Sequence, residues 1–305
     1  MLSTPSRYSA MHGPPDRLLF GVSGVPESSP KPSTEAGIGR CRELGLDALE
    51  MAMVQKVTMG AATAARVRAT AEREDMALSI HAPYYINLNS RDPQKLADSQ
   101  QRILAAARVG DLCGARNIVL HLGFYHDDTP VATTAIIQRH LTPVIETLAA
   151  EASQAVLRPE IMGRVSQWGD LDEVLDLCAA LPRCLPCVDF AHLHARHGRD
   201  NTYAEFVAIL DTMERRLGRR ALDDMHIHVS GIAYGKKGEQ HHLPFADADF
   251  AYRDCLRALR DRDCKGLVIG ESPAREWDVQ VLQRTWRELG DEAVIGGGAT
   301  VMRDA

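Results

Sequence analysis

Short apolar segments and longer amphipathic segments alternate along this chain from Leu18 to about residue 290. The apolar segments have the length and the flanking turns of buried strands, and the stretches between them repeat apolar residues at helical spacing. Strands are expected at 18–23, 46–51, 76–82, 116–122, 154–160, 184–190, 223–230 and 265–271. Helices are expected at 33–44, 59–75, 93–114, 131–153, 171–181, 201–218, 246–262 and 276–289.

These eight strand–helix units predict a single-domain α/β fold, the (β/α)8 or TIM barrel, because alternating units build a parallel sheet that eight strands can close. A doubly wound sheet is the second choice, but Gly21–Pro26 lacks the third glycine of a dinucleotide-binding fingerprint. The Ser-, Pro- and Arg-rich residues 1–17 are predicted to form a flexible leader. The catalytic barrel then covers residues 18–290, and a loose tail covers 291–305.

The composition indicates a cytoplasmic globular protein. The 305 residues are 45% hydrophobic and 25% charged, with no apolar run long enough for a membrane span and no signal-peptide pattern. Seven scattered cysteines indicate a reducing compartment, and Cys184-x-x-Cys187 is interpreted as two buried thiols. The net charge of −6 argues against nucleic-acid binding by overall positive charge but is compatible with a local basic patch. Neither a membrane nor a protein partner is implied.

Potential metal ligands stand at the ends of six consecutive predicted strands. In a TIM barrel the strands end at the catalytic rim, so these side chains are expected to lie close together. Because their neighbours along the strands are apolar, a shared metal cluster explains the repetition better than independent structural roles. The residues are His81, His121, Glu160, Asp189 with His192, His228, and Glu271.

The segment Met225–Pro244 is the densest in potential ligands. Its strand places His226 and His228 on one face, since successive side chains alternate. His226 lies one layer deeper and is interpreted as a supporting core histidine, and Glu50 is expected to support the ligands in the same way. The loop that follows carries Glu239, His241 and His242.

Several imidazoles and carboxylates at one rim can hold more than one divalent ion, with a carboxylate such as Glu160 bridging two of them. Closely spaced ions stabilise the attacking and leaving oxygens of a phosphoryl group. The residues therefore favour phosphodiester hydrolysis.

The motifs around these residues resemble endonuclease IV, a family of zinc-dependent apurinic/apyrimidinic (AP) endonucleases in the xylose isomerase-like TIM barrel superfamily. The motifs follow the family order between about residues 18 and 290. They are His81-Ala-Pro-Tyr84-Tyr85-Ile-Asn-Leu, His121-Leu-Gly, Asp189-Phe-Ala-His192, the His228 strand with its trailing acid and histidines, and Leu-Val-Ile-Gly-Glu271-Ser-Pro.

The resemblance implies up to three Zn2+ per chain, with Mn2+ an alternative at one position. A hydroxide bridging the metals would attack the phosphate on the 5′ side of an abasic site in damaged double-stranded DNA, and Glu160 is the candidate catalytic residue. The first ion would be held by His81, His121 and Glu160, the second by Glu160, Asp189, His228 and Glu271, and the third by His192, Glu239 and either His241 or His242.

The third ligand set departs from the family pattern. The family's loop acid is usually an aspartate two residues before its histidine, whereas Glu239 precedes His241 by two residues and His242 by three. We favour His242, because the longer glutamate changes the reach and Leu243-Pro244 fixes the chain just beyond it.

The resemblance also implies DNA contacts. Tyr84 and Tyr85 fall where the family carries its aromatic wedge, and such rings can fill the gap left by an extruded nucleotide. Packing over the barrel mouth is the alternative role. Lys56, Lys236 and Lys237 are candidate phosphate contacts, with a solvated loop as their alternative.

Two other functions remain open. One is a sugar isomerase or epimerase of the same superfamily, with a single Mn, Mg or Co ion held by Glu160, Asp189, His228 and Glu271. Such an enzyme has no need of His81, His121 and His192 around the same rim. The other is a catalytically silent metal-binding barrel, which the presence of every expected ligand makes the weakest hypothesis.

Overall fold

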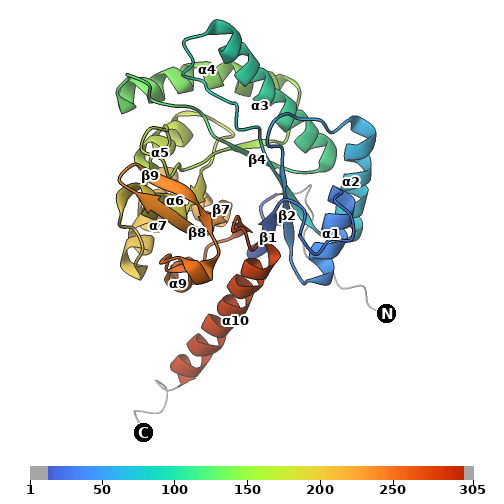
Figure 1. The fold of residues 1–305 in the computed structure, drawn as a ribbon, viewed down its shortest axis with the longest axis vertical. Helices are drawn as coiled ribbons and strands as arrows, with labels where there is room; N and C mark the ends of the chain where they lie inside the picture. Colours follow the sequence, from blue (N-terminus) through green and yellow to red (C-terminus); the bar gives the residue numbers. More distant parts are fainter. Residues whose placement is uncertain (1–12, 299–305) are drawn as a thin grey trace.

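A computed structural model describes the backbone of residues 13–298 and the side chains of residues 13–291, and its strands form a parallel barrel surrounded by helices (Figure 1). The sheet order is β5-β4-β3-β2-β1-β10-β7-β6. Parallel bridges Leu157–Cys184 and Glu160–Cys187 join β5 to β6 and close the barrel, which confirms the predicted fold. The barrel strands are β1 (Leu18–Ser23), β2 (Ala48–Ala52), β3 (Ala77–His81), β4 (Asn117–Leu120), β5 (Val156–Pro159), β6 (Cys187–Asp189), β7 (Met225–Val229) and β10 (Gly266–Gly270).

The helices begin where the local sequence supplies caps. Ser33, Asp92 and Thr129 accept hydrogen bonds from the first turns of α1, α3 and α4. None of the helices among the described residues is long and apolar enough to cross a membrane. The helices are α1 (Thr34–Glu43), α2 (Ala61–Arg73), α3 (Pro93–Cys113), α4 (Pro130–Ala150), α5 (Leu171–Ala180), α6 (Phe190–His197), α7 (Tyr203–Leu217), α8 (Arg220–Asp223), α9 (Tyr252–Asp261) and α10 (Glu276–Gly298), with a 3-10 turn at Phe245–Asp247.

The structure differs from the expected elements in the second half of the chain. A hairpin of β8 (Gly231–Gly235) and β9 (Gly238–Leu243) follows β7, and the short helix α6 begins at Phe190 because the Asp189 side chain caps it. The helix expected from residue 246 begins only at Tyr252, after the turn at Phe245–Asp247.

The sequence predicts a flexible leader at residues 1–17 and a loose tail at residues 291–305. Helix α10 continues to Gly298 and projects beyond the barrel (Figure 1), so residues 291–298 are helical where the sequence analysis expected a loose tail. The leader residues 1–12 and the tail residues 299–305 lie outside the described part of the chain.

The interior of the barrel is apolar on one side and polar on the other. Leu19, Ala48, Ala77, Leu267 and Ile269 fill the side formed by β10, β1, β2 and β3. Their outward-facing neighbours pack against the helices in the main core. Most polar interior side chains come from β4 to β7, the half of the barrel that carries most of the expected ligands, and Glu50 of β2 and Ser79 of β3 lie beside them.

A buried ion pair fills the polar side below the expected site. Arg158, which is 0% exposed, donates to Asn117 Oδ1 at 2.9 Å and to Asp224 Oδ1 at 2.7 Å. Arg116 donates to both carboxylate oxygens of Asp224, at 3.1 and 2.6 Å. Burial favours the neutral acid, but the charges of Arg158 and Arg116 lower the pKa of Asp224 below its usual value.

Replacing Asp224 by Asn should therefore lower the free energy of unfolding at pH 7 by about 3–5 kcal/mol, because two guanidinium groups lose their shared counter-charge. The pKa of Asp224 is lower in the folded chain than the unfolded value of about 3.9, so its stabilisation is present above that pH and is lost as the pH falls through the folded pKa. Urea unfolding of the wild type and D224N at pH 7 and pH 3 measures this difference. The exposed Asp263→Asn change is the matched control and should stay within about 0.5 kcal/mol; a D224N variant as stable as wild type at pH 7 would contradict the assignment.

Candidate metal centre

Closure of the barrel brings the expected ligands to one rim. His81 and Asp189 are the last residues of β3 and β6, and Glu271 directly follows β10. The expected ligands form three groups whose ligand atoms lie within 4.8 Å of one another: His81, His121 and Glu160; Glu160, Asp189, His228 and Glu271; and Asp189, His192 and His242. A fourth such group, Cys187, His226 and His228, lies deeper in the barrel.

Glu160 lies at the centre of these groups. Its Oε2 is 3.2 Å from His81 Nε2 and 2.8 Å from His121 Nε2. Its Oε1 is 3.3 Å from His228 Nδ1 and 3.4 Å from His192 Nδ1. The carboxylate is 1% exposed, and although burial would raise its pKa, the neighbouring imidazoles hold that pKa well below the usual value. Each oxygen is thus shared between two imidazoles, which is the geometry that a bridging ligand needs.

His81 directs a lone pair at this carboxylate. His81 Nδ1 donates to the Ala82 carbonyl at 2.9 Å, and because a carbonyl can only accept, the neutral ring must carry its lone pair on Nε2, towards Glu160. Two acceptors in contact need a proton or a cation between them. Burial lowers the pKa of His81, but the hydrogen bond and charge of Glu160 raise it to about 9.

His192 and His242 present the same arrangement more clearly. His192 Nδ1 faces the Ile161 carbonyl at 2.9 Å, and His242 Nδ1 faces the Glu271 carbonyl at 3.1 Å. Both neutral rings therefore bear lone pairs on Nε2, and these two atoms lie 3.2 Å apart. Glu239 Oε2 adds a third acceptor 3.6 Å from His192 Nε2.

This donor set fits divalent cations. Imidazole nitrogens whose other ring N–H is fixed by a carbonyl, together with carboxylate oxygens, are what zinc-type ions bind. Asp189 supports the fit, because its Oδ2 is buried without a hydrogen-bond partner while its Oδ1 accepts from His192 N at 2.7 Å. Burial raises the pKa of Asp189 to about 6, which a nearby cation would reverse.

A β-bulge selects His242 over His241. In the β8–β9 hairpin Tyr234 pairs with Glu239 and Ala233 pairs with His241, so Gln240 is an extra residue in β9. In a regular strand, side chains three apart point to opposite faces, and the extra residue reverses this for Glu239 and His242. Both therefore face His192, whereas His241 is exposed. The bulge accounts for the unusual spacing of three.

Glu50 supports the cluster from below. Its Oε2 accepts from His226 Nε2 at 2.9 Å and from Ser79 Oγ at 2.8 Å, and its Oε1 lies 3.0 Å from His228 Nε2 in an ionic contact not aligned as a hydrogen bond. This contact directs His228 Nδ1 towards Glu160 and Glu271, each 3.3 Å away. His226 is fully buried, and burial lowers its pKa.

The expected DNA-contacting side chains surround the rim. Tyr84 is 47% exposed and its ring stacks on His121, with centroids 5.3 Å apart, while Tyr85 is 64% exposed. Lys56 is exposed beside a cavity of about 300 Å³ at the end of β2. Lys236 and Lys237 are exposed and form the turn of the hairpin.

Three further residues that the sequence-based predictions do not include lie around the hairpin. Gly163 and Arg164 contact β9, and Arg196 binds the loop that carries them. A sequence signal existed for Arg196 alone, since it follows His192 by four residues and so shares its face of a helix.

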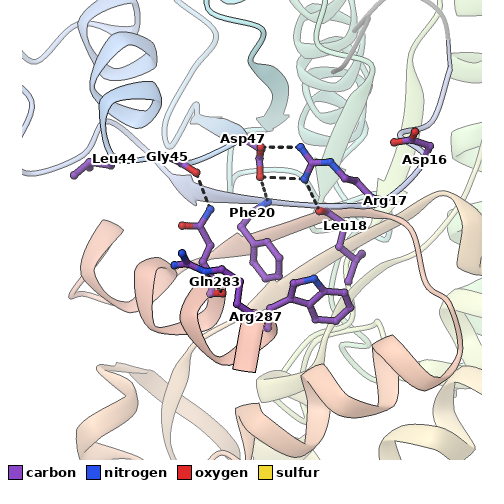
Figure 2. Close-up of a pocket in the computed structure, with 10 residues that line it drawn as sticks. Asp16, Arg17, Leu18, Phe20, Leu44, Gly45, Asp47, Gln283 and Arg287 are labelled. Carbon is purple, nitrogen blue, oxygen red and sulfur yellow. Dashed lines mark hydrogen bonds and ion pairs between the residues drawn. The ribbon is translucent and has the colours of Figure 1, made fainter. Parts of the chain in front are cut away.

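A cavity of about 670 Å³ lies far from this chemistry, at the amino-terminal ends of β1 and β2 beside α10 (Figure 2). Phe20 and Trp286 line it, and the charged pair Arg17–Asp47 closes its edge with an N–O distance of 3.0 Å. None of its lining residues is a histidine or cysteine. We therefore assign the chemistry to the rim, where the histidines and carboxylates meet.

Comparisons with known proteins agree with this geometry. A family model described as "Xylose isomerase-like TIM barrel" matches residues 38–303. An uncharacterized protein of Methanocaldococcus jannaschii is 41% identical over 273 residues, covering 89% of this chain and 98% of that protein. A "Probable endonuclease 4" of Mycoplasma pneumoniae is 30% identical over 201 residues, covering 64% of this chain and 68% of that protein.

Solved structures share the fold at low identity. Endonuclease IV from Thermus thermophilus aligns with a TM-score of 0.68 and 17% identity, covering 90% of this chain and 99% of that one. A D-tagatose 3-epimerase-like protein aligns with a TM-score of 0.70 and 15% identity, covering 90% and 97%. At such identities these two matches show the fold alone.

The bulge makes a specific prediction about cation binding. His242→Ala should remove about one divalent ion per chain, and His241→Ala should remove none, because only His242 faces His192. Deleting Gln240 should retain the ion, since a regular strand then places Glu239 and His242 two residues apart on one face. Elemental analysis of protein dialysed against Zn2+ without chelator measures the count. Loss of the ion in H241A with retention in H242A would contradict the assignment.

Proposed function

The chain belongs to the xylose isomerase-like TIM barrel family and is related to endonuclease 4 proteins, as its motifs indicated, and on that premise we propose that it is a zinc-dependent phosphodiesterase. Its substrate in this proposal is double-stranded DNA, cleaved on the 5′ side of abasic sites. The observation that carries the proposal is that three ligand groups lie side by side, the first and second sharing Glu160 and the second and third sharing Asp189.

The residues divide into three cation positions in this proposal. His81, His121 and Glu160 form the first, and Glu160, Asp189, His228 and Glu271 form the second. His192, Glu239 and His242 form the third. When bound, such cations lower the pKa of water and stabilise charge on the attacking and leaving oxygens of a phosphate.

The chain's own groups hold and orient the reactants. Glu160 links the first two positions, because its Oε2 lies against His81 and His121 of the first and its Oε1 lies against His228 of the second. The carbonyls of Ala82, Ile161 and Glu271 hold three of the rings in one tautomer, so their lone pairs point inward. A side-chain nucleophile is not needed, because the attacking oxygen comes from water.

The proposed DNA contacts follow from exposure at the rim. Tyr85 is the more available of the two aromatic side chains, because Tyr84 also covers His121. Lys56 and the Lys236–Lys237 turn are free to reach phosphates on either side of the mouth. The seven cysteines are free and buried, which supports the proposal that the protein works in the cytoplasm.

A single-metal sugar isomerase or epimerase is the second candidate. Its support is that Glu160, Asp189, His228 and Glu271 form a complete four-ligand site by themselves, in a fold that the epimerase-like structure shares. The endonuclease proposal accounts better for the lone pairs of His81, His192 and His242, which such an isomerase would leave unused.

Protein purified without chelator is expected to carry about three Zn2+ and to nick a duplex containing one tetrahydrofuran lesion on its 5′ side. An undamaged duplex of the same sequence is the control. Elemental analysis and denaturing electrophoresis of end-labelled DNA give the two readouts. A single bound manganese with no nicking, together with epimerisation of a free sugar, would favour the isomerase instead.

Glu160→Gln should lower the rate of incision of abasic DNA by more than about 100-fold, because an amide cannot bridge two cations. Glu50→Gln should lower that rate by about 10–100-fold, as is usual when a residue that hydrogen-bonds to a metal ligand is changed. Circular dichroism of both variants should match wild type. Near wild-type turnover by E160Q would refute the site assignment.

A further inference from the structure

The loop that follows β5 is wrapped around one buried guanidinium group. The Arg196 side chain is 7% exposed, and its Nη1 donates to the carbonyls of Met162, Arg164 and Gln167 at 3.1, 2.8 and 3.1 Å. Its Nη2 donates to Tyr125 Oη at 2.8 Å. These bonds occupy both terminal nitrogens of the guanidinium and hold residues 162–167 in place. None of these loop residues offers a metal ligand.

The same loop pairs with the hairpin that carries two of the expected ligands. Glu239 N donates to the Gly163 carbonyl at 3.0 Å, and Val165 N donates to the Lys237 carbonyl at 3.3 Å. Arg164 also forms an antiparallel bridge with Gly238. The loop therefore pairs with the start of β9 through an isolated bridge, and its position sets the position of Glu239.

The contact has no room for a β-carbon on either side. A β-carbon on Gly163 would lie 2.7 Å from Glu239 Cβ, 3.0 Å from Glu239 Oε2 and 3.0 Å from His192 Cδ2. Gly238 has a φ of +82°, and a β-carbon there would lie 2.1 Å from the Gly163 carbonyl oxygen. Gly163 thus touches two residues of the third cation position at once.

We infer that Arg196 and Gly163 are positioning residues for that third position. Helix α6 supplies His192 as a ligand and, one turn later, supplies Arg196 to hold the loop against which Glu239 is set. One short helix thereby places a ligand directly and a second ligand indirectly. The inference rests on the third cation position of the proposed function and needs no assumption about DNA.

The hairpin has a second, separate anchor, which makes the inference testable. Tyr234 donates to Asp249 Oδ2 at 2.8 Å, and His194 Nε2 lies 3.2 Å from Asp249 Oδ1. Disturbing the loop should therefore shift Glu239 without detaching the hairpin. Lysine cannot replace Arg196, because it has one donor nitrogen, whereas Arg196 binds the three carbonyls through Nη1 and the Tyr125 hydroxyl through Nη2.

The test compares Arg196→Lys and Gly163→Ala with two matched controls. The first is Arg216→Lys, a half-buried arginine paired with the exposed Asp172 and Asp176, and the second is Gly39→Ala, where a β-carbon meets nothing within 4 Å. Zn2+ affinity is measured without DNA by competition with a chromophoric chelator, and unfolding temperature is measured alongside it. We expect the dissociation constant of one zinc to rise by about 10–100-fold in both test variants, as when an outer partner of a ligand is lost. The other two zincs and both controls should stay within threefold.

Wild-type affinity at every zinc in R196K and G163A would overturn the inference. Equal weakening of all three zincs with a lowered unfolding temperature would also overturn it, because that result indicates general destabilisation. A wild-type protein that binds fewer than three zincs would contradict the third position and with it this inference. Three zincs with no incision of abasic DNA would contradict only the proposed activity.

Discussion

A carboxylate removed from water must be matched by positive charge, and the burial of Glu160 imposes this requirement on the whole rim. The bridge between Glu160 and Cys187 closes the barrel, so the residue that completes the fold also holds the charge that the site must balance. Four imidazoles surround it at 2.8 to 3.4 Å. In His81, His192 and His242 a backbone carbonyl accepts from Nδ1, so the lone pair of each neutral ring lies on Nε2. A proton or a cation must then lie between Nε2 and the acceptor that it faces.

The barrel itself accounts for only part of the function. Glu160, Asp189, His228 and Glu271 lie on the barrel strands or directly after them, and a single-ion enzyme could use them alone. The additional ligands His192, Glu239 and His242 come from α6 and the hairpin, which are insertions between barrel units. The proposed third cation position therefore depends on short elements outside the barrel strands, where contacts such as Gly163 against Glu239 set the geometry, whereas the proposed first position uses His81 and His121 at the ends of barrel strands.

The sequence predicted the barrel and the strand-end ligands because both follow from local periodicity and from a topology that brings strand ends together. It did not predict the hairpin, since the second strand, Gly238–Leu243, is polar except at its two ends, and the few apolar residues of the first do not mark a pair of strands. The preference for His242 rested on side-chain reach, whereas the structural reason is the bulge at Gln240, which depends on cross-strand register. Arg158 and Arg196 were not identified because their acceptors are distant in the chain, and only tertiary packing brings those acceptors together.

The central claim is that several cations lie next to one another around one shared carboxylate. X-ray absorption spectroscopy at the zinc edge of the zinc-loaded protein tests it most directly. The account predicts nitrogen and oxygen neighbours at about 2.0–2.2 Å and a zinc–zinc distance of about 3.5–4 Å. A spectrum with the same first neighbours but no zinc–zinc scattering would contradict the account.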